Sequence, residues 1–286
     1  MIENKENKEI FLCAICNIES GTCNEDCKFC TQSVKYKADI LRYKRKEIEQ
    51  IVQEAKRAKA NNANGFCLVT AGKGLDDKRL KFVVEAAKAV KKENLGLILI
   101  ACNGTASVEQ LQTLKEAGVD AYNHNLETAE DYYPQIVTTH TWQERYQTCK
   151  NVKEVGLRLV CGGIFGLGET QEQRISMLES IASLEPMNVP LNFFHPNKAL
   201  PIVENSVTRE EAFELIALAR KMVPNAMKIM VAGGRELMFG EEQYKIFEKG
   251  ANAFVIGDYL TTAGKSPIED MQELEKLGFK IKRERD

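Results

Sequence analysis

The chain has 286 residues, of which 44% are hydrophobic and 28% are charged, and its formal net charge at pH 7 is −2. This composition is that of a globular protein able to bury a full core, and the lack of a basic excess argues against nucleic acid or an anionic membrane as partner. The length suits one α/β barrel, so we expect a single domain over residues 1–286.

The first nine residues are polar and mixed in charge, without the apolar run of a signal peptide or the arginine bias of a transit peptide. No later stretch reaches the ~18 apolar residues of a membrane span. We therefore expect a cytoplasmic protein. Nine cysteines in such a chain indicate reduced thiols and metal rather than disulfides.

Strand-like apolar segments alternate with helical patterns along the whole chain, which predicts βα units and a parallel sheet. Eight such units favour a (β/α)8 barrel, whose active site lies at the C-terminal ends of the strands. A doubly wound open sheet is the alternative, but it would not gather the polar strand residues around one mouth. Capping boxes are expected at Ser107 with Gln110 and at Thr208 with Glu211. The expected strands are 10–15, 65–70, 97–101, 121–125, 158–162, 190–194, 228–232 and 251–256, and the clearest helical patterns are 47–59, 81–92, 107–117, 141–154 and 209–222.

Three cysteines, Cys23, Cys27 and Cys30, follow the first strand in the spacing C-x3-C-x2-C. Thiolates select iron–sulfur clusters, zinc or copper. A structural zinc site uses four closed ligands, whereas three cysteines on a four-iron cluster leave one iron open for another ligand. The triplet therefore indicates a metal site rather than three unrelated thiols.

The spacing and the Cys-x-aromatic-Cys ending resemble the signature of the radical S-adenosylmethionine (SAM) superfamily. The resemblance implies that Cys23, Cys27 and Cys30 hold a [4Fe–4S] cluster that binds SAM and cleaves it to a 5′-deoxyadenosyl radical. The glycine-rich segment 162–169 matches the G-x-I-x-G-x-x-E pattern that the superfamily uses around the SAM adenine. The same resemblance implies cofactor contacts for Ile164 and Phe29.

A polar run, residues 122–128, stands where a core strand should be apolar. If the extended conformation continues, Asn123, Asn125 and Glu127 share one side of the strand. Carboxamides and a carboxylate at a barrel mouth suit recognition of ribose hydroxyls, an amino acid moiety or a urea-like ligand. Structural hydrogen bonding is the alternative.

The resemblance narrows to the biotin synthase family over nearly the whole chain. It is carried by segments 20–33 and 122–125, by Thr138-Thr139 before 143–145, and by segments 161–164 and 232–236. Members of that family insert sulfur into dethiobiotin, using sulfide from a second iron–sulfur cluster. The resemblance also implies a homodimer and reduced flavodoxin or ferredoxin as electron donor. By position, the resemblance implies that Cys67, Cys102 and Cys161 bind the auxiliary cluster. It implies that Asn125 and Glu127 contact SAM and that Asn123 and Asn192 hydrogen-bond the ureido ring of dethiobiotin. It also implies that Arg145 adds positive charge beside the substrate and the cofactor.

The chain departs from the family pattern at one auxiliary-cluster position. The family places an arginine ligand five residues before the motif arginine, here Arg235, and that position is Met230. A thioether is a weak, neutral ligand, so the [2Fe–2S] type that the family implies stays open. We hypothesise that Cys13, Cys16 or both support a different, larger cluster, the alternative being that they are packed strand thiols.

Two other functions are compatible with part of the sequence. A related radical SAM enzyme, such as a methylornithine synthase or a hydrogenase-maturation protein, would share the cysteine triplet. A zinc scaffold could use Cys13, Cys16, Cys27 and Cys30, but it would leave Cys23 and the polar run without a role. Cys149 is expected to be an ordinary helix thiol, and none of the three histidines is assigned as a catalytic base.

Overall fold

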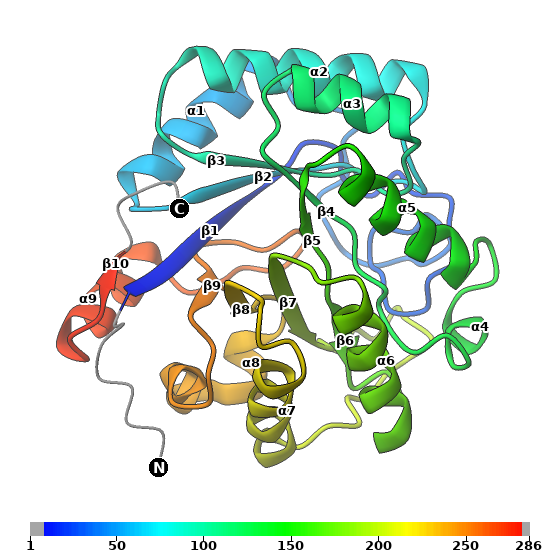
Figure 1. Ribbon diagram of the computed structural model, residues 1–286, viewed down its shortest axis with the longest axis vertical. Coiled ribbons are helices and arrows are strands. Elements are labelled where there is room, and N and C mark those ends of the chain that lie inside the picture. Colours follow the sequence, from blue (N-terminus) through cyan, green and yellow to red (C-terminus); the bar gives the residue numbers. More distant parts are fainter. Residues whose placement is uncertain (1–8, 282–286) are drawn as a thin grey trace.

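A computed structural model describes residues 9–281, in which parallel strands close into a barrel (Figure 1). Each strand pairs in parallel with its neighbour, and β1 pairs with β9 to close the ring. The expected (β/α)8 barrel is therefore confirmed, and the open sheet is excluded. The barrel strands are β1 (Glu9–Asn17), β2 (Gly65–Val69), β3 (Ile98–Cys102), β4 (Ala121–Asn123), β5 (Arg158–Val160), β6 (Gly163–Phe165), β7 (Asn188–Phe193), β8 (Lys228–Val231) and β9 (Ala253–Val255).

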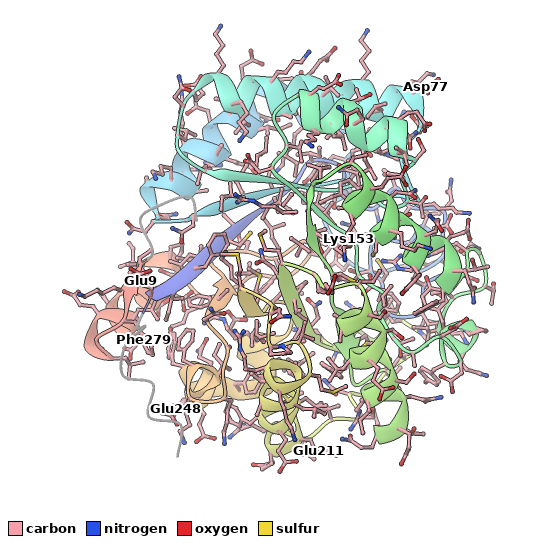
Figure 2. The ribbon with its side chains drawn as sticks, viewed as in Figure 1. Glu9, Asp77, Lys153, Glu211, Glu248 and Phe279 are labelled. Carbon is pink, nitrogen blue, oxygen red and sulfur yellow. The ribbon has the colours of Figure 1, made fainter. Side chains whose placement is uncertain are left out.

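Helices surround the barrel on its outside (Figure 1). Both expected capping boxes are present, at Ser107 with Gln110 and at Thr208 with Glu211. The outer face of α2 carries long charged side chains that point into solvent (Figure 2), while its other face buries apolar residues against the sheet. The helices are α1 (Ile48–Ala60), α2 (Asp77–Lys92), α3 (Val108–Glu116), α4 (Tyr133–Ile136), α5 (Trp142–Glu154), α6 (Gln171–Ser183), α7 (Arg209–Met222), α8 (Arg235–Phe239), the 3-10 helix η1 (Gly240–Phe247) and α9 (Pro267–Lys276).

The fifth strand differs from the expected segment 158–162, because it consists of two short pieces, β5 and β6. The chain passes so close to β7 at this break that a Cβ added to Gly162 would lie 1.8 Å from Pro190 O. A further strand, β10 (Lys280–Ile281), pairs with the start of β1 at Glu9 and Ile10. No described helix is long and apolar enough to cross a membrane.

Two separate apolar cores result from the alternation of side chains along the strands. The larger core lies between the barrel and its helices, and it includes Leu12 and Cys16 from β1. The smaller core fills the barrel and includes Phe11 and Cys13 from the same strand. Period-two alternation therefore sends Cys13 and Cys16 to opposite sides of β1. The barrel interior contains Phe11, Cys13, Cys67, Val69, Ile98, Ile100, Ala121, Val160, Met230, Ala232, Ala253 and Val255.

Candidate active site at the barrel mouth

The loop that carries Cys23, Cys27 and Cys30 follows β1 and is held by its own backbone. Cys30 N donates to Cys27 O at 3.0 Å, and Cys23 N donates to Gln32 O at 3.2 Å. The Gln32 side chain is buried, and its Oε1 accepts a hydrogen bond from Gly21 N at 2.6 Å. These bonds fix the loop before any ligand is bound.

Burial controls the ionisation of the three loop thiols. It raises the pKa of Cys23 and Cys27, and it raises the pKa of Cys30 to about 12. Neutral buried thiols are poor nucleophiles, whereas a bound metal ionises its thiol ligands outright. The loop is therefore suited to metal ligation and not to covalent catalysis by cysteine.

Asp26, which directly precedes Cys27, fastens the cysteine loop to the segment after α4. Its Oδ1 accepts hydrogen bonds from Thr138 N at 2.9 Å and from Thr139 Oγ1 at 3.0 Å, and its Oδ2 accepts one from the Thr138 hydroxyl. Burial alone would raise the pKa of Asp26, but these hydrogen bonds outweigh it and lower the pKa to about 2. Asp26 is therefore a charged clamp.

A chain of polar contacts runs from the cysteine loop to the polar run after β4. His140 Nδ1 donates to Glu25 Oε2 at 2.7 Å, and Arg145 Nη1 donates to His140 Nε2 at 3.5 Å. Arg145 then forms a 2.7 Å ion pair with Glu127 and donates through Nε to Asn125 O at 2.6 Å. Arg145, on α5, thereby connects the predicted residues Asn125 and Glu127 with the cysteine loop.

Glu127 sits in an unusual backbone conformation. Its φ is 71°, in the left-handed region that side-chain-bearing residues rarely adopt. Ile164 N donates to Glu127 O at 2.8 Å, which joins this turn to β6. Burial raises the pKa of Glu127, and Arg145 opposes that effect only in part. Glu127 Oε2 is buried and has no hydrogen-bond partner among the described residues, so it is available to a ligand.

The two predicted substrate-binding asparagines differ in the hydrogen-bonding capacity that they have left. Asn123 Nδ2 donates to Cys102 Sγ at 3.6 Å, while its Oδ1 is buried without a partner among the described residues. Asn192 already donates to Gly163 O at 3.1 Å and accepts from Gly233 N at 2.9 Å. Asn192 keeps one N–H and one lone pair for a ligand.

Three thiols lie in or against the apolar core inside the barrel. Cys13 and Cys67 belong to the inner core, and Cys102 packs against it. The interaction between the Cys67 and Cys102 side chains raises the pKa of Cys67, an effect to which burial adds, and it lowers the pKa of Cys102. Gly65 makes room beside them, because an added Cβ there would lie 3.3 Å from Cys13 Sγ. Met230 lines the same interior.

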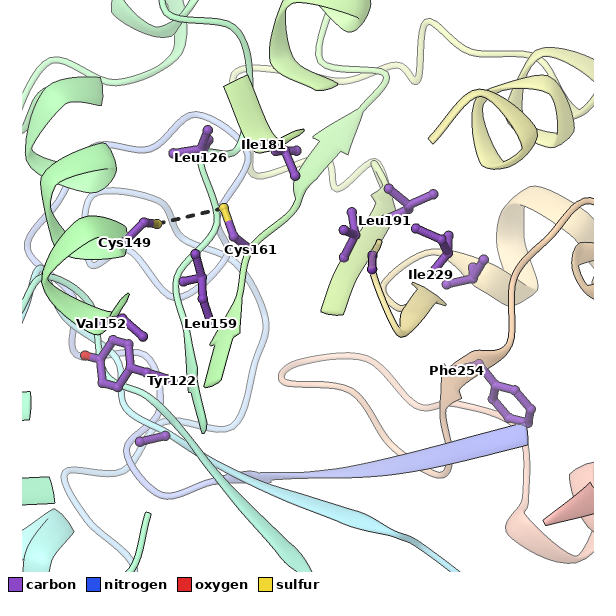
Figure 3. Packing of buried hydrophobic residues seen from close by; sticks show 14 of the residues in the cluster. Tyr122, Leu126, Cys149, Val152, Leu159, Cys161, Ile181, Leu191, Ile229 and Phe254 are labelled. Carbon is purple, nitrogen blue, oxygen red and sulfur yellow. Dashed lines mark hydrogen bonds between the residues drawn. The ribbon is translucent and has the colours of Figure 1, made fainter. Parts of the chain in front are cut away.

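The structure does not bring Cys161 to this interior group. Cys161 is fully buried in the outer core, and Cys149 Sγ on α5 lies 3.8 Å from Cys161 Sγ (Figure 3). Cys149 also donates to His124 O at 3.1 Å. Cys161 immediately follows Val160, which faces inward, so alternation along β5 turns Cys161 outward. Cys161 therefore lies apart from Cys67 and Cys102 in this structure, and its role as a ligand of the auxiliary cluster stays a prediction.

The remaining predicted residues, Phe29, Ile164 and Cys16, belong to the outer core or pack against it. Phe29 and Ile164 are partly buried and pack against the outer core, from the cysteine loop and from β6. Cys16 lies in the outer core, so it does not share the interior with Cys13. This separation also argues against a zinc scaffold that would need both thiols at one metal.

A single metal ion and an iron–sulfur cluster require different arrangements of their ligand residues. Among residues 9–281, no three His, Cys, Asp or Glu side chains converge on one point as ligands of a single ion would. A cluster is bound differently, because each thiolate ligates a separate iron around a larger body. Two groups of three thiols, together with buried acceptors that lack partners among the described residues, fit two clusters and their ligands.

Sequence reasoning missed three residues that organise this mouth. Asp26, Glu25 and His140 carry most of the contacts between the cysteine loop and the segment before α5. The two adjacent acids between Cys23 and Cys27 were the available signal, since both lie within the predicted metal-binding loop. Their partners lie 112 and 115 residues away along the chain, so they could not be read from spacing.

Two family models match the chain. The Radical SAM superfamily model matches residues 18–181, and the model of the Biotin and Thiamin Synthesis associated domain matches residues 190–280. The first begins directly after β1 and runs through most of α6, and the second covers the rest of the barrel from within β7. Both models together therefore describe one closed barrel.

Curated relatives match over almost their entire length. The chain is 66% identical to a biotin synthase of Aliarcobacter butzleri (strain RM4018) over 275 residues, covering 96% of this chain and 97% of that one. It is 64% identical to a biotin synthase of a Nitratiruptor species, covering 96% and 98%. A biotin synthase of Campylobacter jejuni (strain 81116) is 54% identical, covering 95% and 97%.

Solved structures with the same fold are more distant in sequence. The FeFe-hydrogenase maturase from Carboxydothermus hydrogenoformans superposes with a TM-score of 0.82 at 18% identity, covering 96% of this chain and 68% of that one. Methylornithine synthase superposes with a TM-score of 0.82 at 22% identity, covering 96% and 84%. These two similarities show the fold alone, whereas the activity is indicated by the curated relatives of higher sequence identity.

Proposed function

The chain belongs to the biotin synthase family of radical SAM enzymes, and from this premise we propose which of its residues perform the reaction. Its activity is that of a biotin synthase, a radical SAM sulfurtransferase that uses a [4Fe–4S] cluster with SAM. The single observation that carries the assignment of roles is the division of its thiols into a loop group and an interior group. The rivals that share only the fold are 18% to 22% identical.

Cys23, Cys27 and Cys30 hold the SAM-binding cluster, and the interior thiols hold the auxiliary cluster. When bound, the first cluster and SAM supply the hydrogen-abstracting radical, and the second supplies the sulfur. The protein contributes binding, orientation and exclusion of water, as is usual for enzymes whose cofactors carry the chemistry. Burial raises the pKa of Cys13, Cys27 and Cys30, which supports a ligand role for these thiols over a nucleophilic one.

Glu127, Asn125 and Arg145 position SAM beside the loop. The free Oε2 of Glu127 suits a ribose hydroxyl donor, and the guanidinium of Arg145 suits a carboxylate. Arg145 also fixes the turn that presents Glu127, through its ion pair with Glu127 and its bond to Asn125 O. Phe29 and Ile164 would supply apolar contacts to the adenine from the two flanking segments.

Asn123 and Asn192 bind the ureido ring of dethiobiotin. Asn123 Oδ1 is a buried acceptor without a partner among the described residues, and it lies next to Cys102 through the Nδ2 contact. A ureido N–H would satisfy it and would hold the substrate close to the interior thiols. Asn192 contributes less to binding of the ureido ring than Asn123, because two of its hydrogen bonds already hold β7 to its neighbours.

Cys13, Cys67 and Cys102 are the ligands that the interior offers to the auxiliary cluster. Cys161 would join them only after a change in the backbone of the β5–β6 break, where it now faces Cys149. Met230 occupies the interior place of the expected arginine as a neutral side chain. We therefore propose a cluster that depends on Cys13 and not on Cys16.

Mössbauer and EPR spectra of anaerobically reconstituted variants test this ligand set. Cys13→Ala is expected to remove or alter the auxiliary-cluster signal, and Cys16→Ala is expected to leave it intact. Iron and sulfide content should fall in the first variant alone. An unchanged auxiliary signal in Cys13→Ala would overturn the role of Cys13.

The remaining proposals concern the protein in its surroundings. We propose that it acts in the cytoplasm as a homodimer of one-domain subunits spanning residues 1–286, with reduced flavodoxin or ferredoxin as electron donor. The two family models share one closed barrel, which supports the single domain. Residues 1–8 and 282–286 lie outside the described part.

Sulfur transfer itself can be followed with an isotope. The enzyme is reconstituted with iron and heavy-isotope sulfide, freed of excess sulfide, and incubated with SAM, dithionite and dethiobiotin. Biotin carrying the heavy isotope is the expected product. Deoxyadenosine without biotin would reject the substrate while keeping the radical chemistry.

A further inference from the structure

The segment after the cysteine loop covers the outer side of that loop. Val34 N donates to Cys23 O at 2.8 Å, and the Tyr36 hydroxyl donates to Asp26 O at 2.6 Å. Arg42 reaches back to the start of the loop, where it donates to Gly21 O at 2.6 Å. This part of the protein surface therefore lies directly against the proposed SAM-cluster loop.

Positive charge dominates this surface, which, together with the end of the cysteine loop from residue 28, we call the basic segment (residues 28–44). It carries five cationic side chains and one carboxylate, Asp39, although the whole chain has a net charge of −2. Arg42 donates only to backbone carbonyls, so no carboxylate cancels its charge. The other four cations form no ion pair or side-chain hydrogen bond with any described residue: Lys28, Lys35, Lys37 and Lys44.

The positive surface ends sharply at the next two residues. Arg45 forms a 2.7 Å ion pair with Glu19, and Lys46 forms a 2.6 Å ion pair with Glu54. These two cations are neutralised within the protein. The uncompensated charge is therefore concentrated beside the cysteine loop and does not continue along α1.

Two large apolar side chains are exposed within the basic segment. Leu41 is 79% exposed and Val34 is 51% exposed. Single exposed apolar residues are common on protein surfaces, but these two lie among unpaired cations on one segment. Apolar residues with a charged rim are the anatomy of a protein–protein contact, and small contacts of this kind are typical of transient electron-transfer complexes.

We propose that the basic segment is the docking surface for an acidic one-electron carrier protein that reduces the cluster at Cys23, Cys27 and Cys30. The inference rests on the proposed function of those thiols. In the step, the carrier loses one electron and the cluster gains it, and no bond forms or breaks. Opposite charges speed the encounter, while a small contact lets the oxidised carrier leave.

The test compares two triple variants of the reconstituted full chain, with reduced flavodoxin as the acidic probe. Lys35, Lys37 and Lys44 are changed to Gln in the first. In the matched control, three exposed lysines elsewhere that form no ion pairs among the described residues are changed to Gln: Lys88, Lys221 and Lys249. Stopped-flow absorbance gives the second-order rate constant of cluster reduction, and flavin fluorescence gives the binding affinity.

The first variant should lower the rate constant about tenfold at low ionic strength, and the control should not. The difference should vanish at about 0.5 M salt, where such charges are screened. Leu41→Asp should weaken flavodoxin binding at every salt concentration. Equal reduction of the first variant and the wild type by flavodoxin would overturn the docking surface.

Dithionite separates failure of this inference from failure of the proposed function. It is small and needs no docking surface, so it should reduce the cluster equally fast in the wild type and in both triple variants. Deoxyadenosine should then form from SAM in all three proteins. If dithionite reduces no cluster in the wild type, the role of the three loop thiols is wrong, and the docking inference falls with it.

Discussion

Glu127 combines three features that are unfavourable for a carboxylate in a folded protein. Its side chain is only 13% exposed, its backbone is left-handed with φ 71°, and one of its oxygens is buried with no partner among the described residues. Backbone strain and unsatisfied polar atoms persist together mainly at functional sites, where a ligand completes the arrangement. The residue therefore supports a binding role through its physical state as well as through its place in the family pattern.

Replacing Glu127 tests that role. Glu127→Gln removes the charge that pairs with Arg145 and the acceptor offered to SAM, so SAM affinity should fall about tenfold or more. SAM titration of the reduced cluster, followed by EPR, measures the change. Glu130→Gln, on the exposed side of the same loop, is the matched control and should bind SAM normally. Unchanged affinity in Glu127→Gln would remove Glu127 from the SAM site.

The charge of Asp26 should make the free energy of unfolding depend on pH. Its folded pKa of about 2 lies below the ordinary value of 3.8, so its contribution is present above about pH 4 and is lost as pH falls toward 2. Because Asp26 stays partly open to solvent, the contribution is on the order of 1 kcal/mol. Urea unfolding of the metal-free protein should show Asp26→Asn less stable at pH 7 and closer to wild type at pH 3.

A constant difference between Asp26→Asn and the wild type across that pH range would contradict the clamp. Asp39→Asn serves as the control, because Asp39 is exposed and forms no hydrogen bond or ion pair with a described residue. Its unfolding free energy should follow the wild type at both pH values.

The break between β5 and β6 is the element that sets the geometry of the mouth. β4 pairs with β5, and the polar run that follows β4 pairs with the chain beyond the break. There, Leu126 N donates to Gly162 O at 2.9 Å, and Ile164 N donates to Glu127 O at 2.8 Å. The same break places Cys161 against Cys149 on α5. One interrupted strand therefore positions Glu127 and withholds Cys161 from the barrel interior.

Gly162→Ala should disrupt this element. The added Cβ would lie 1.8 Å from Pro190 O, a backbone atom that cannot move aside alone, so the free energy of unfolding should fall by about 2 kcal/mol or more. Gly96→Ala is the control, since its Cβ would meet only Lys59 Nζ at 3.7 Å and should cost about 1 kcal/mol from its left-handed φ. Equal losses in denaturant unfolding would show that the strand break tolerates a side chain.

Among the elements, the sequence predicted those features that depend on the local periodicity of apolar residues. The alternation of strand-like and helical segments predicted the barrel, and the Ser107 and Thr208 caps marked two helix starts correctly. The side that Cys161 faces could not be predicted from the sequence, because it depends on the approach of Gly162 to Pro190, a contact between strands. The helix α6 was not among the clearest helical patterns because its polar residues, including the buried Arg174, obscure its apolar face.

The whole molecule keeps its two groups of thiols in different surroundings. The loop group lies at the mouth under the basic segment, and the interior group lies within the barrel core. Asn123 reaches the interior group through its 3.6 Å contact with Cys102. Because the (β/α)8 barrel opens at the C-terminal ends of its strands, a substrate bound at Asn123 would have the SAM site on one side and the interior thiols on the other.

The sharpest test of this account separates radical formation from sulfur insertion in one measurement. Wild type and Cys67→Ala are reconstituted anaerobically and incubated with SAM, dithionite and dethiobiotin, and deoxyadenosine and biotin are quantified by mass spectrometry. Both products are expected from the wild type, and deoxyadenosine without biotin is expected from Cys67→Ala. Biotin from Cys67→Ala, or its absence from the wild type, would contradict the central claim that the loop thiols hold the cluster used for radical formation and that the interior thiols hold the cluster that supplies the sulfur.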